Sequence, residues 1–250
     1  MTVQFDDLRL DWLGYATVRL EAPDGPVVYL DPGRYGVFDE YDPRDGGHTS
    51  EASGDSSEPW SDGDIICVSH VHHYDTDGIE RVARENATVI VHEAVHHSET
   101  DRDVTPVRDL PYDTHRVDDE FDDLIGDVIL RTTAAYNHAD GPHTRPDGTP
   151  FHPEGTGCGF LLDVDGTTVF WTGDTDVLDG HAALDVDLLL VPIGGTFTMD
   201  REAAAGLAEA MDPGLVVPVH YDTFEAITAD AEAFVADLDA RSVPVTLDGE

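Results

Sequence analysis

One stretch of the sequence is the most informative about the fold: Asp64-Ile65-Ile66-Cys67-Val68-Ser69-His70-Val71-His72-His73-Tyr74-Asp75-Thr76-Asp77-Gly78-Ile79. Its apolar run predicts a buried strand over 65–68, and the apolar spacing that follows predicts a helix over 76–85. Between them lie three His and two carboxylates within eight residues. Imidazole and carboxylate are the usual ligands of Zn²⁺ and related ions. Because side chains alternate along extended backbone, His70 and His72 are expected to point the same way. The stretch therefore predicts a metal site between a strand and a helix.

The rest of the chain predicts a mixed α/β protein. Gly- and Pro-rich turns separate strands over 8–13, 16–21 and 27–30. A strand over 88–91 and a short helix over 93–98 follow the decisive stretch, and residues 104–107, 115–117 and 128–134 are predicted strands of a second sheet. Later strands are expected over 160–164, 168–171, 188–191, 215–219 and 243–247, with helices over 200–211 and 224–239. Two β-rich halves that each end in strand–helix units predict two sheets packed face to face, with helices outside.

The length of 250 residues suits one large domain with a sizeable core. Residues 33–63 are dense in Gly, Ser, Asp and Pro and nearly free of aliphatic side chains. The strands before them are too few to bury a core of their own. We therefore expect a single domain over 1–250 with a polar surface insertion at about 33–63.

The strongly negative net charge of this chain argues against binding to polyanionic partners. It has 53 acidic residues, 38 of them Asp, against 13 basic residues that are all Arg, for a formal net charge of -40. A polyanionic surface repels phosphate backbones, so binding to nucleic acid or to an anionic membrane is not expected. The acids are dispersed rather than gathered in a tail, and Lys is absent. This pattern indicates a salt-adapted, halophilic protein whose self-repulsion is screened by salt.

The cysteines and the hydropathy pattern indicate a cytoplasmic location. Two cysteines, Cys67 and Cys158, are too few for a disulfide framework and are expected to be buried thiols. The first residues show neither the basic nor the apolar region of a signal peptide. No apolar run approaches the length of a membrane span.

Several further segments, together with the His-rich stretch, resemble the metallo-β-lactamase superfamily. That family carries His-x-His-x-Asp-His between a buried strand and a helix. Residues 171–176 (WTGDTD) resemble its Gly-Asp-Thr segment, and residues 217–221 (VPVHY) resemble the segment with its last His ligand. Residues 134–137 (AAYN) and 192–199 (PIGGTFTM) resemble a branch of small hydrolases near the ascorbate-6-phosphate lactonases. The ordered match runs from about residue 8 to the C-terminus.

The resemblance implies a four-layer αβ/βα sandwich of two mixed sheets, with metals at one edge between them. It implies that His70 and His72 serve a first ion, that Asp174 bridges or anchors two ions, and that His220 is the last His ligand. The chain departs from the motif where Tyr74 and Asp75 replace its Asp and final His. His73 and Asp75 could still serve a second ion from a shifted turn, or the site could hold one ion. We favour two, with catalytic roles for Asp174 and Asp75.

The family also has a His after its middle strand, and the loop over 137–157 offers three. His152 lies in a His-Pro segment like that of the near branch, His138 directly follows the strand, and His143 lies between them. We rank His152 first and His138 second. Asp31 ends a strand before Pro32 and is expected either to support the metal centre or to cap a turn.

These features predict a hydrolase that uses a metal-activated hydroxide on a small-molecule lactone, ester or phosphodiester. The cofactor is expected to be one or two divalent ions, Zn²⁺ first, with Mn or Fe as alternatives. A nuclease-type phosphodiesterase and a catalytically degenerate metal- or ligand-binding member remain as rival functions. A small-molecule substrate is the expected partner, and an oligomer is possible.

Overall fold

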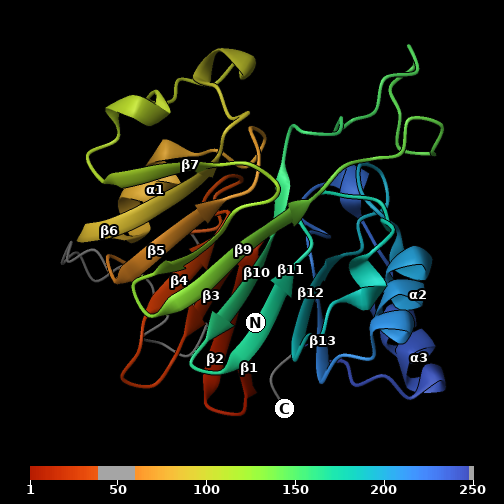
Figure 1. Ribbon diagram of the computed structural model, residues 1–250. Coiled ribbons are helices and arrows are strands. Elements are labelled where there is room, and N and C mark those ends of the chain that lie inside the picture. The colour runs from red at the N-terminus through yellow and green to blue at the C-terminus, as the bar shows by residue number, and fades with distance from the viewer. Residues whose placement is uncertain (39–59, 248–250) are drawn as a thin grey trace, which may run out of the picture.

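A computed structural model describes residues 1–38 and 60–247, whose strands form two mixed β-sheets (Figure 1). The first sheet has the order β1-β2-β3-β4-β5-β6-β7, and the second has the order β13-β12-β11-β10-β9-β8. In each sheet an antiparallel meander leads into parallel strands. The predicted fold class, an α/β sandwich of two mixed sheets, is confirmed.

The strands and helices have the following bounds. The first sheet contains β1 (Thr2–Phe5), β2 (Leu8–Gly14), β3 (Thr17–Glu21), β4 (Val27–Leu30), β5 (Gly63–Val68), β6 (Ala83–His92) and β7 (Asp113–Val117). The second contains β8 (Asp122–Ile125), β9 (Val128–Ala134), β10 (Cys158–Val164), β11 (Thr167–Trp171), β12 (Leu188–Pro192) and β13 (Leu215–Val219). The α-helices are α1 (Thr76–Val82), α2 (Arg201–Met211) and α3 (Ala231–Arg241).

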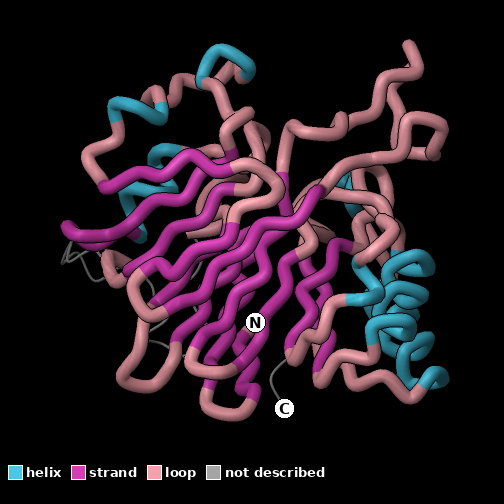
Figure 2. Tube along the Cα trace, viewed as in Figure 1, coloured by secondary structure: helices cyan, strands magenta, loops and turns pink. Residues whose placement is uncertain are grey.

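Two apolar clusters hold these layers together. The larger joins Leu10 and Leu20 of the first sheet to Leu130 and Phe160 of the second, so the sheets pack face to face. The smaller joins β12 and β13 to α2 and α3. Figures 1 and 2 show α2 and α3 together on the outer side of the second sheet, with α1 beside the first. Burial of apolar surface on both sides of each sheet explains the nearly unbroken apolar runs of β5 and β12.

Several local predictions need correction. The strand β7 belongs to the first sheet, where it pairs in parallel with β6. The segment predicted as a strand over 104–107 instead leads into a 3-10 helix, Val107–Asp109, because Pro106 cannot donate to a sheet ladder. The helix expected over 224–239 is divided into a 3-10 turn, Glu225–Ile227, and α3. Only a 3-10 turn, His97–Glu99, occupies the predicted helix at 93–98, and the expected last strand is one bridge at Val245.

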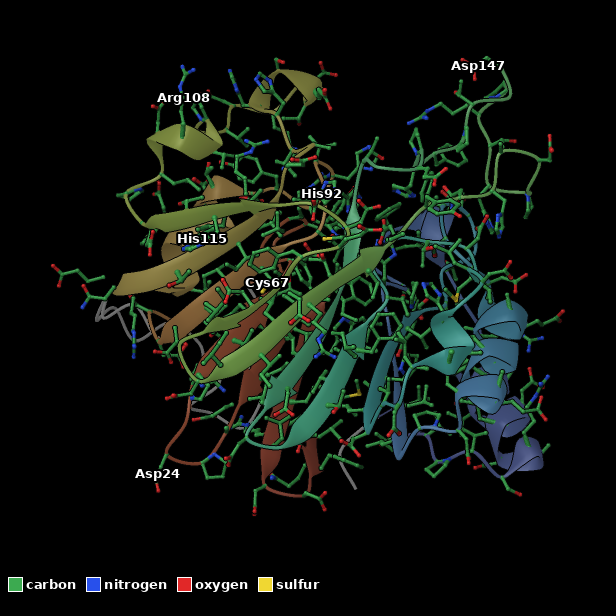
Figure 3. The ribbon with its side chains drawn as sticks, viewed as in Figure 1. Asp24, Cys67, His92, Arg108, His115 and Asp147 are labelled. Atoms are coloured by element: carbon green, nitrogen blue, oxygen red, sulfur yellow. The ribbon has the colours of Figure 1, made fainter. Side chains whose placement is uncertain are left out.

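Most of the predicted insertion, residues 39–59, lies outside the described residues. Cys67 and Cys158 are free and buried; Cys67 lies on β5 inside the molecule (Figure 3). Among the described residues, no helix has the length and apolarity needed to cross a membrane.

Candidate metal centre

The candidate site lies where strand ends of both sheets meet. His70 follows β5 and forms a bridge with Gly157, just before β10 of the other sheet. Asp174 follows β11, and His220 follows β13. His152 comes from the long loop between β9 and β10, whose far tip carries Asp147 (Figure 3). The fold thus brings together side chains that are up to 150 positions apart in the sequence.

Asp174 lies at the centre of this group. Its Oδ2 is 3.6 Å from Nε2 of His70 and of His73, and 3.4 Å from Nε2 of His152 and of His220. Two ligand atoms bonded to one tetrahedral Zn²⁺ at 2.0–2.1 Å lie about 3.3–3.4 Å apart. Each imidazole is therefore placed at nearly the separation that two ligands of a common ion require.

The turn before Asp174 is built for close packing. Gly173 has a φ of +70°, in the region that disfavours side chains. A Cβ on Gly173 would lie 2.5 Å from the carbonyl oxygen of Cys158 on the neighbouring strand. Glycine at this position therefore lets the backbone turn and aim Asp174 between the sheets.

Hydrogen bonds on the side of the ring away from Asp174 fix the orientation of His152. Its Nδ1 lies 3.2 Å from Oδ1 of Asn137 and 3.2 Å from the carbonyl oxygen of Phe197. Both neighbours accept hydrogen bonds, so Nδ1 carries the proton and Nε2 keeps a lone pair. That Nε2 also lies 3.2 Å from Nδ1 of His72. Asn137 therefore selects the tautomer of His152 that can bind a cation.

Asp31, at the end of β4, holds His73 in the same way. Its carboxylate is 2.9 Å from Nδ1 of His73 and accepts hydrogen bonds from Ser69 Oγ at 2.8 Å and Trp171 Nε1 at 2.8 Å. A His that binds metal usually donates its other nitrogen to a carboxylate or carbonyl group. Of the two roles expected for Asp31, this position favours support of the metal centre.

The electrostatics of the cluster suit a cation. Burial raises the pKa of Asp174, but the surrounding imidazoles, His220 first, outweigh it and hold that pKa at about 2. Burial lowers the pKa of His70, and it lowers the pKa of His152 to about 4. For His73, Asp31 and Asp174 outweigh burial and raise the pKa. Near neutral pH the cluster thus offers an ionised Asp174 and neutral His70 and His152, which are the forms that bind metal, whereas His73 has to release its proton when it binds an ion.

Orphaned polar atoms show that the residues fit an ion. Nε2 of His70, of His73 and of His220 is buried without a hydrogen-bond partner among the described residues, as is Oδ1 of Asp174. Buried polar atoms are nearly always paired, so several orphans facing one point call for a ligand. Ligand atoms of two sets lie within 4.8 Å of one another: His70 with His72 and His152, and His70 with His73 and Asp174.

Backbone strain also concentrates here. Asp31, His220 and Tyr15 have φ values of 45°, 55° and 51°, in the left-handed region that side chains other than glycine rarely adopt. Each such residue costs on the order of 1–3 kcal/mol. Tyr15 is also tied to His220, because its carbonyl oxygen accepts the His220 N–H at 2.9 Å. These three strained residues all lie at strand ends next to the cluster.

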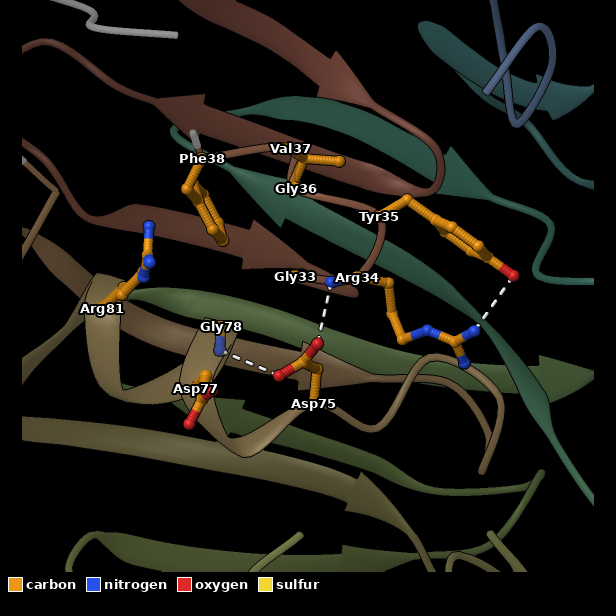
Figure 4. A pocket seen from close by; sticks show the side chains of 10 residues that line it. All are labelled: Gly33, Arg34, Tyr35, Gly36, Val37, Phe38, Asp75, Asp77, Gly78 and Arg81. Carbon is orange, nitrogen blue, oxygen red and sulfur yellow. Dashed lines mark hydrogen bonds between the residues drawn. The ribbon is translucent and has the colours of Figure 1, made fainter. Parts of the chain in front are cut away.

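Three predicted candidates lie elsewhere. The structure does not bring Asp75 to the cluster, because its carboxylate caps α1 through the Gly78 N–H at 3.1 Å and accepts the Arg34 N–H at 2.9 Å (Figure 4). His138 is exposed, with Nε2 3.0 Å from the Val177 carbonyl oxygen. His143 is paired with Asp176. We therefore remove Asp75 and His138 from the proposed ligand set.

The unusual order of the His-rich motif has a structural explanation. Tyr74, in the position of the family's Asp, points into the core, where its hydroxyl donates to the Thr105 carbonyl oxygen at 2.6 Å. Asp75, in the position of the final His, begins α1. His73 instead enters the cluster, 4.2 Å from the ring of His70. The chain thus keeps an imidazole in the cluster, two positions earlier than the final His of the family motif.

A cavity of about 320 Å³ opens over the cluster. His72, His152, Asp174 and His220 form its floor, and the lining also includes Tyr15 together with Arg34, Tyr35, Arg145, Phe151, Phe197 and Phe224. Sequence reasoning missed these lining residues. A usable signal existed for two of them, since Arg34 and Arg145 are rare basic residues in Gly- and Pro-rich segments of an acidic chain.

Replacing Asp31 by Asn is expected to weaken metal binding by about 10- to 100-fold, the usual effect of losing a carboxylate behind a His ligand. Asn fills the same volume but brings no negative charge to His73. Titration of the purified variant against a competing chelator measures the apparent Kd. Asp62→Asn is the matched control, because Asp62 accepts from Arg19 and Tyr29 and from none of the clustered His. An unchanged Kd for Asp31→Asn would remove Asp31 from the centre.

Comparisons with known proteins point to one family and its fold. Residues 9–220 match the model of the "Beta-lactamase superfamily domain" family. A UPF0173 metal-dependent hydrolase of Thermococcus kodakarensis is 31% identical over 179 residues, covering 68% of this chain and 72% of the relative. One from Staphylococcus carnosus is 28% identical and covers 97% and 98% of the two chains. A crystal structure from Parabacteroides distasonis, 19% identical, has a TM-score of 0.71 over 98% of this chain and 97% of that one.

Proposed function

This chain belongs to the metallo-β-lactamase superfamily and is a metal-dependent hydrolase, and from that premise we propose that it cleaves a small-molecule lactone, ester or phosphodiester at a centre of two divalent ions. The observation that carries this proposal is the cluster around Asp174. Five imidazoles and one carboxylate converge there. Six donors exceed the four ligands of a tetrahedral Zn²⁺ site, so they suit two ions better than one.

The residues divide into two sets in this proposal. His70, His72 and His152 would hold one ion, and His73 and His220 would hold the other, with Asp174 shared between them. Imidazole nitrogen with one carboxylate favours Zn²⁺, with Mn²⁺ or Fe²⁺ as alternatives. When bound, such ions polarise a carbonyl or phosphoryl oxygen and make water a nucleophile near neutral pH.

The chain's own residues supply orientation and hydrogen bonding. Asp174, ionised at neutral pH, can accept a hydrogen bond from the attacking water and fix its direction. Tyr15 lines the same cavity, and its ring is 4.6 Å from that of His220. Burial, followed by the charge of Asp174, raises the pKa of Tyr15 well above its usual value. Tyr15 therefore keeps its proton and can donate a hydrogen bond to a substrate oxygen on which negative charge develops.

The size and charge of the site favour a small substrate. A cavity of about 320 Å³ lies at the low end of the range for small-molecule pockets. The net charge of -40 and the absence of Lys disfavour the rival function on RNA or DNA. Within the superfamily, the segments at 134–137 and 192–199 support a place near the ascorbate-6-phosphate lactonases.

The direct test is a panel of lactones, carboxylic esters and phosphodiesters, assayed with protein reconstituted with Zn²⁺, Mn²⁺ or Fe²⁺. Hydrolysis of one class should disappear after treatment with a chelator and return when the metal is restored. Double-stranded and single-stranded nucleic acids serve as the comparison class. Full metal content without turnover of any compound would instead favour the degenerate, ligand-binding alternative.

The acidity supports a second proposal, that the protein is adapted to a salty cytoplasm. At 0.01 M salt the screening length is about 30 Å, and at 1 M it is about 3 Å, so self-repulsion weakens steeply as salt is added. We expect the melting temperature to rise by about 10 °C or more between low and molar KCl, equivalent to about 3–5 kcal/mol for a chain of this size. Thermal melts across KCl concentrations measure this, and a flat curve would contradict salt adaptation.

A further inference from the structure

We infer that the substrate is an anion, whose carboxylate or phosphate group is held by Arg34 and Arg145 while its apolar body lies along an aromatic wall above the metal centre. This inference rests on the proposed hydrolase function and names the substrate class of the same site. It starts from the two arginines that line the cavity.

Within the described part of the chain, Arg34 and Arg145 differ from most arginines because they donate to no carboxylate. At least seven other arginines, for example Arg131 with Asp122 at 3.1 Å, form ion pairs with Asp or Glu. Among the described residues, Arg34 instead donates to the His72 carbonyl oxygen and the Tyr35 hydroxyl, and Arg145 donates to the carbonyl oxygens of Pro150 and Phe151. In a chain with 53 acidic residues, two cavity-facing cations that have no anionic partner among residues 1–38 and 60–247 point to an anionic ligand.

Aromatic rings connect the two arginines. The guanidinium carbon of Arg34 lies 4.7 Å from the ring centre of Tyr35, and that of Arg145 lies 5.4 Å from the ring centre of Phe151. Between the two arginines the aromatic rings follow one another in a row. The distance between ring centres is 4.8 Å from Tyr35 to Phe224, 6.4 Å from Phe224 to Phe197 and 4.9 Å from Phe197 to Phe151. This aromatic wall offers an apolar surface of tilted and perpendicular rings with a cation at each end.

The turn that presents Arg34 is strained and held in place. Gly33, Arg34, Tyr35 and Gly36 all have positive φ, at 114°, 66°, 51° and 73°. The carboxylate of Asp75 accepts the Arg34 N–H, and a Cβ on Gly33 would lie 2.8 Å from the Cβ of Asp75 (Figure 4). Strained turns persist where their geometry serves a site. Asp75 is therefore a positioning residue for Arg34.

The geometry explains how an anion would reach a strongly acidic protein. Arg34 and Arg145 line the same cavity as His72 and His152, and the Arg34 guanidinium donates to the His72 carbonyl oxygen, so positive charge lies close to the floor of the cavity. Low-dielectric aromatic walls focus this local positive field outward. A planar acid group can take two parallel hydrogen bonds from one guanidinium, which a neutral isostere cannot match.

Calorimetric titration of the metal-loaded protein tests the inference, at the lowest KCl concentration that keeps it folded. The probes are phenylphosphate, benzoate, inorganic phosphate and the neutral benzyl alcohol. Charge-assisted hydrogen bonds are stronger than neutral ones, so Arg34→Gln and Arg145→Gln should each weaken binding of the preferred aromatic acid about tenfold or more. The double variant should lose about a hundredfold, while benzyl alcohol binding stays the same. The preference between phenylphosphate and benzoate identifies the acid group.

Arg131→Gln, on β9, is the matched control and should bind like the wild type. Asp75→Ala should weaken the aromatic acids but not benzyl alcohol, which separates positioning of Arg34 from general instability. The inference is overturned if the double variant, with normal metal content, binds the acids within twofold of wild type, because the ions alone would then hold them. It is also overturned if wild type binds benzyl alcohol as tightly as the acids. Arg-dependent binding without turnover in the hydrolase panel would defeat the proposed reaction but not this inference.

Discussion

The Asp174→Asn variant is expected to lose at least one bound ion and to fall in kcat by about 10³-fold or more. Asp174 supplies the anionic oxygen that lies within 3.4–3.6 Å of four imidazole Nε2 atoms. Asn has the same shape but no charge, so two cations could not be held close together across it. Loss of one ion removes several kcal/mol of transition-state stabilisation, and about 4 kcal/mol corresponds to a thousandfold in rate.

Metal analysis and steady-state kinetics on the same preparation check this result. Asp165→Asn, an exposed change of the same chemistry in the turn between β10 and β11, is the control and should match wild type. Retention of two ions and of activity within about threefold by Asp174→Asn would contradict a bridging role. The fold of the variant should survive, since no hydrogen bond to Asp174 from a described backbone group is lost.

The second large effect separates His73 from Asp75. His73→Ala is expected to reduce the metal content from about two ions to about one, because it removes one of the two imidazoles proposed for the second ion. Asp75→Ala should leave the metal content at wild-type level. It should instead cost about 1 kcal/mol of stability through loss of the helix cap. The sequence alone predicts the opposite result for Asp75, so this pair of variants tests the structural assignment sharply.

Metal content per chain, measured by elemental analysis after dialysis, decides this prediction. His115→Ala is a suitable control for handling and folding, since His115 lies on β7 (Figure 3), outside the cluster. A drop to one ion in Asp75→Ala with normal content in His73→Ala would restore the sequence-based assignment. Equal losses in both variants would indicate that the turn over 70–77 fails as a unit, which would contradict separate roles.

The class of fold followed from local patterns. Apolar runs such as 65–68 and 188–191, each bounded by turns, predicted buried strands, and the caps at Asp200 and Asp212 bounded α2 closely. Assignment of strands to sheets was less certain, because pairing depends on contacts distant in sequence. Residues 115–117 were assigned to the second sheet with the neighbouring segments 104–107 and 128–134, yet the parallel pairing of β7 with β6 places them in the first sheet.

The candidate site was predictable in part. His70 was predicted from the clustered His after a buried strand, and Asp174 and His220 were assigned by the family resemblance; the structure brings all three together. Asp75 could not be judged that way, because a carboxylate before a helix serves equally as a cap or as a ligand. His152 was chosen over His138 by resemblance alone. The structure shows the physical reason, since Asn137 and Phe197 orient His152, whereas His138 binds the Val177 carbonyl oxygen.

The cavity as a whole could not be predicted. Tyr15, Arg34, Arg145 and Phe224 lie in turns and loops far apart in the chain, and although the two arginines stand out as rare basic residues, their local sequence does not show that all four share one cavity. Their roles depend on side-chain direction, which left-handed backbone at Tyr15 and Arg34 determines. Such conformations depend on contacts from elsewhere, such as Asp75 to the Arg34 N–H.

The most direct test of the account is the anomalous scattering from crystals of the purified protein, recorded on both sides of the Zn, Fe and Mn absorption edges. We expect two peaks per chain: one bounded by His70, His72 and His152, and one bounded by His73 and His220, with Asp174 between them. A single peak ringed by Asp174 and its four nearest imidazoles, or a peak beside Asp75, would contradict the two-ion centre proposed for this hydrolase.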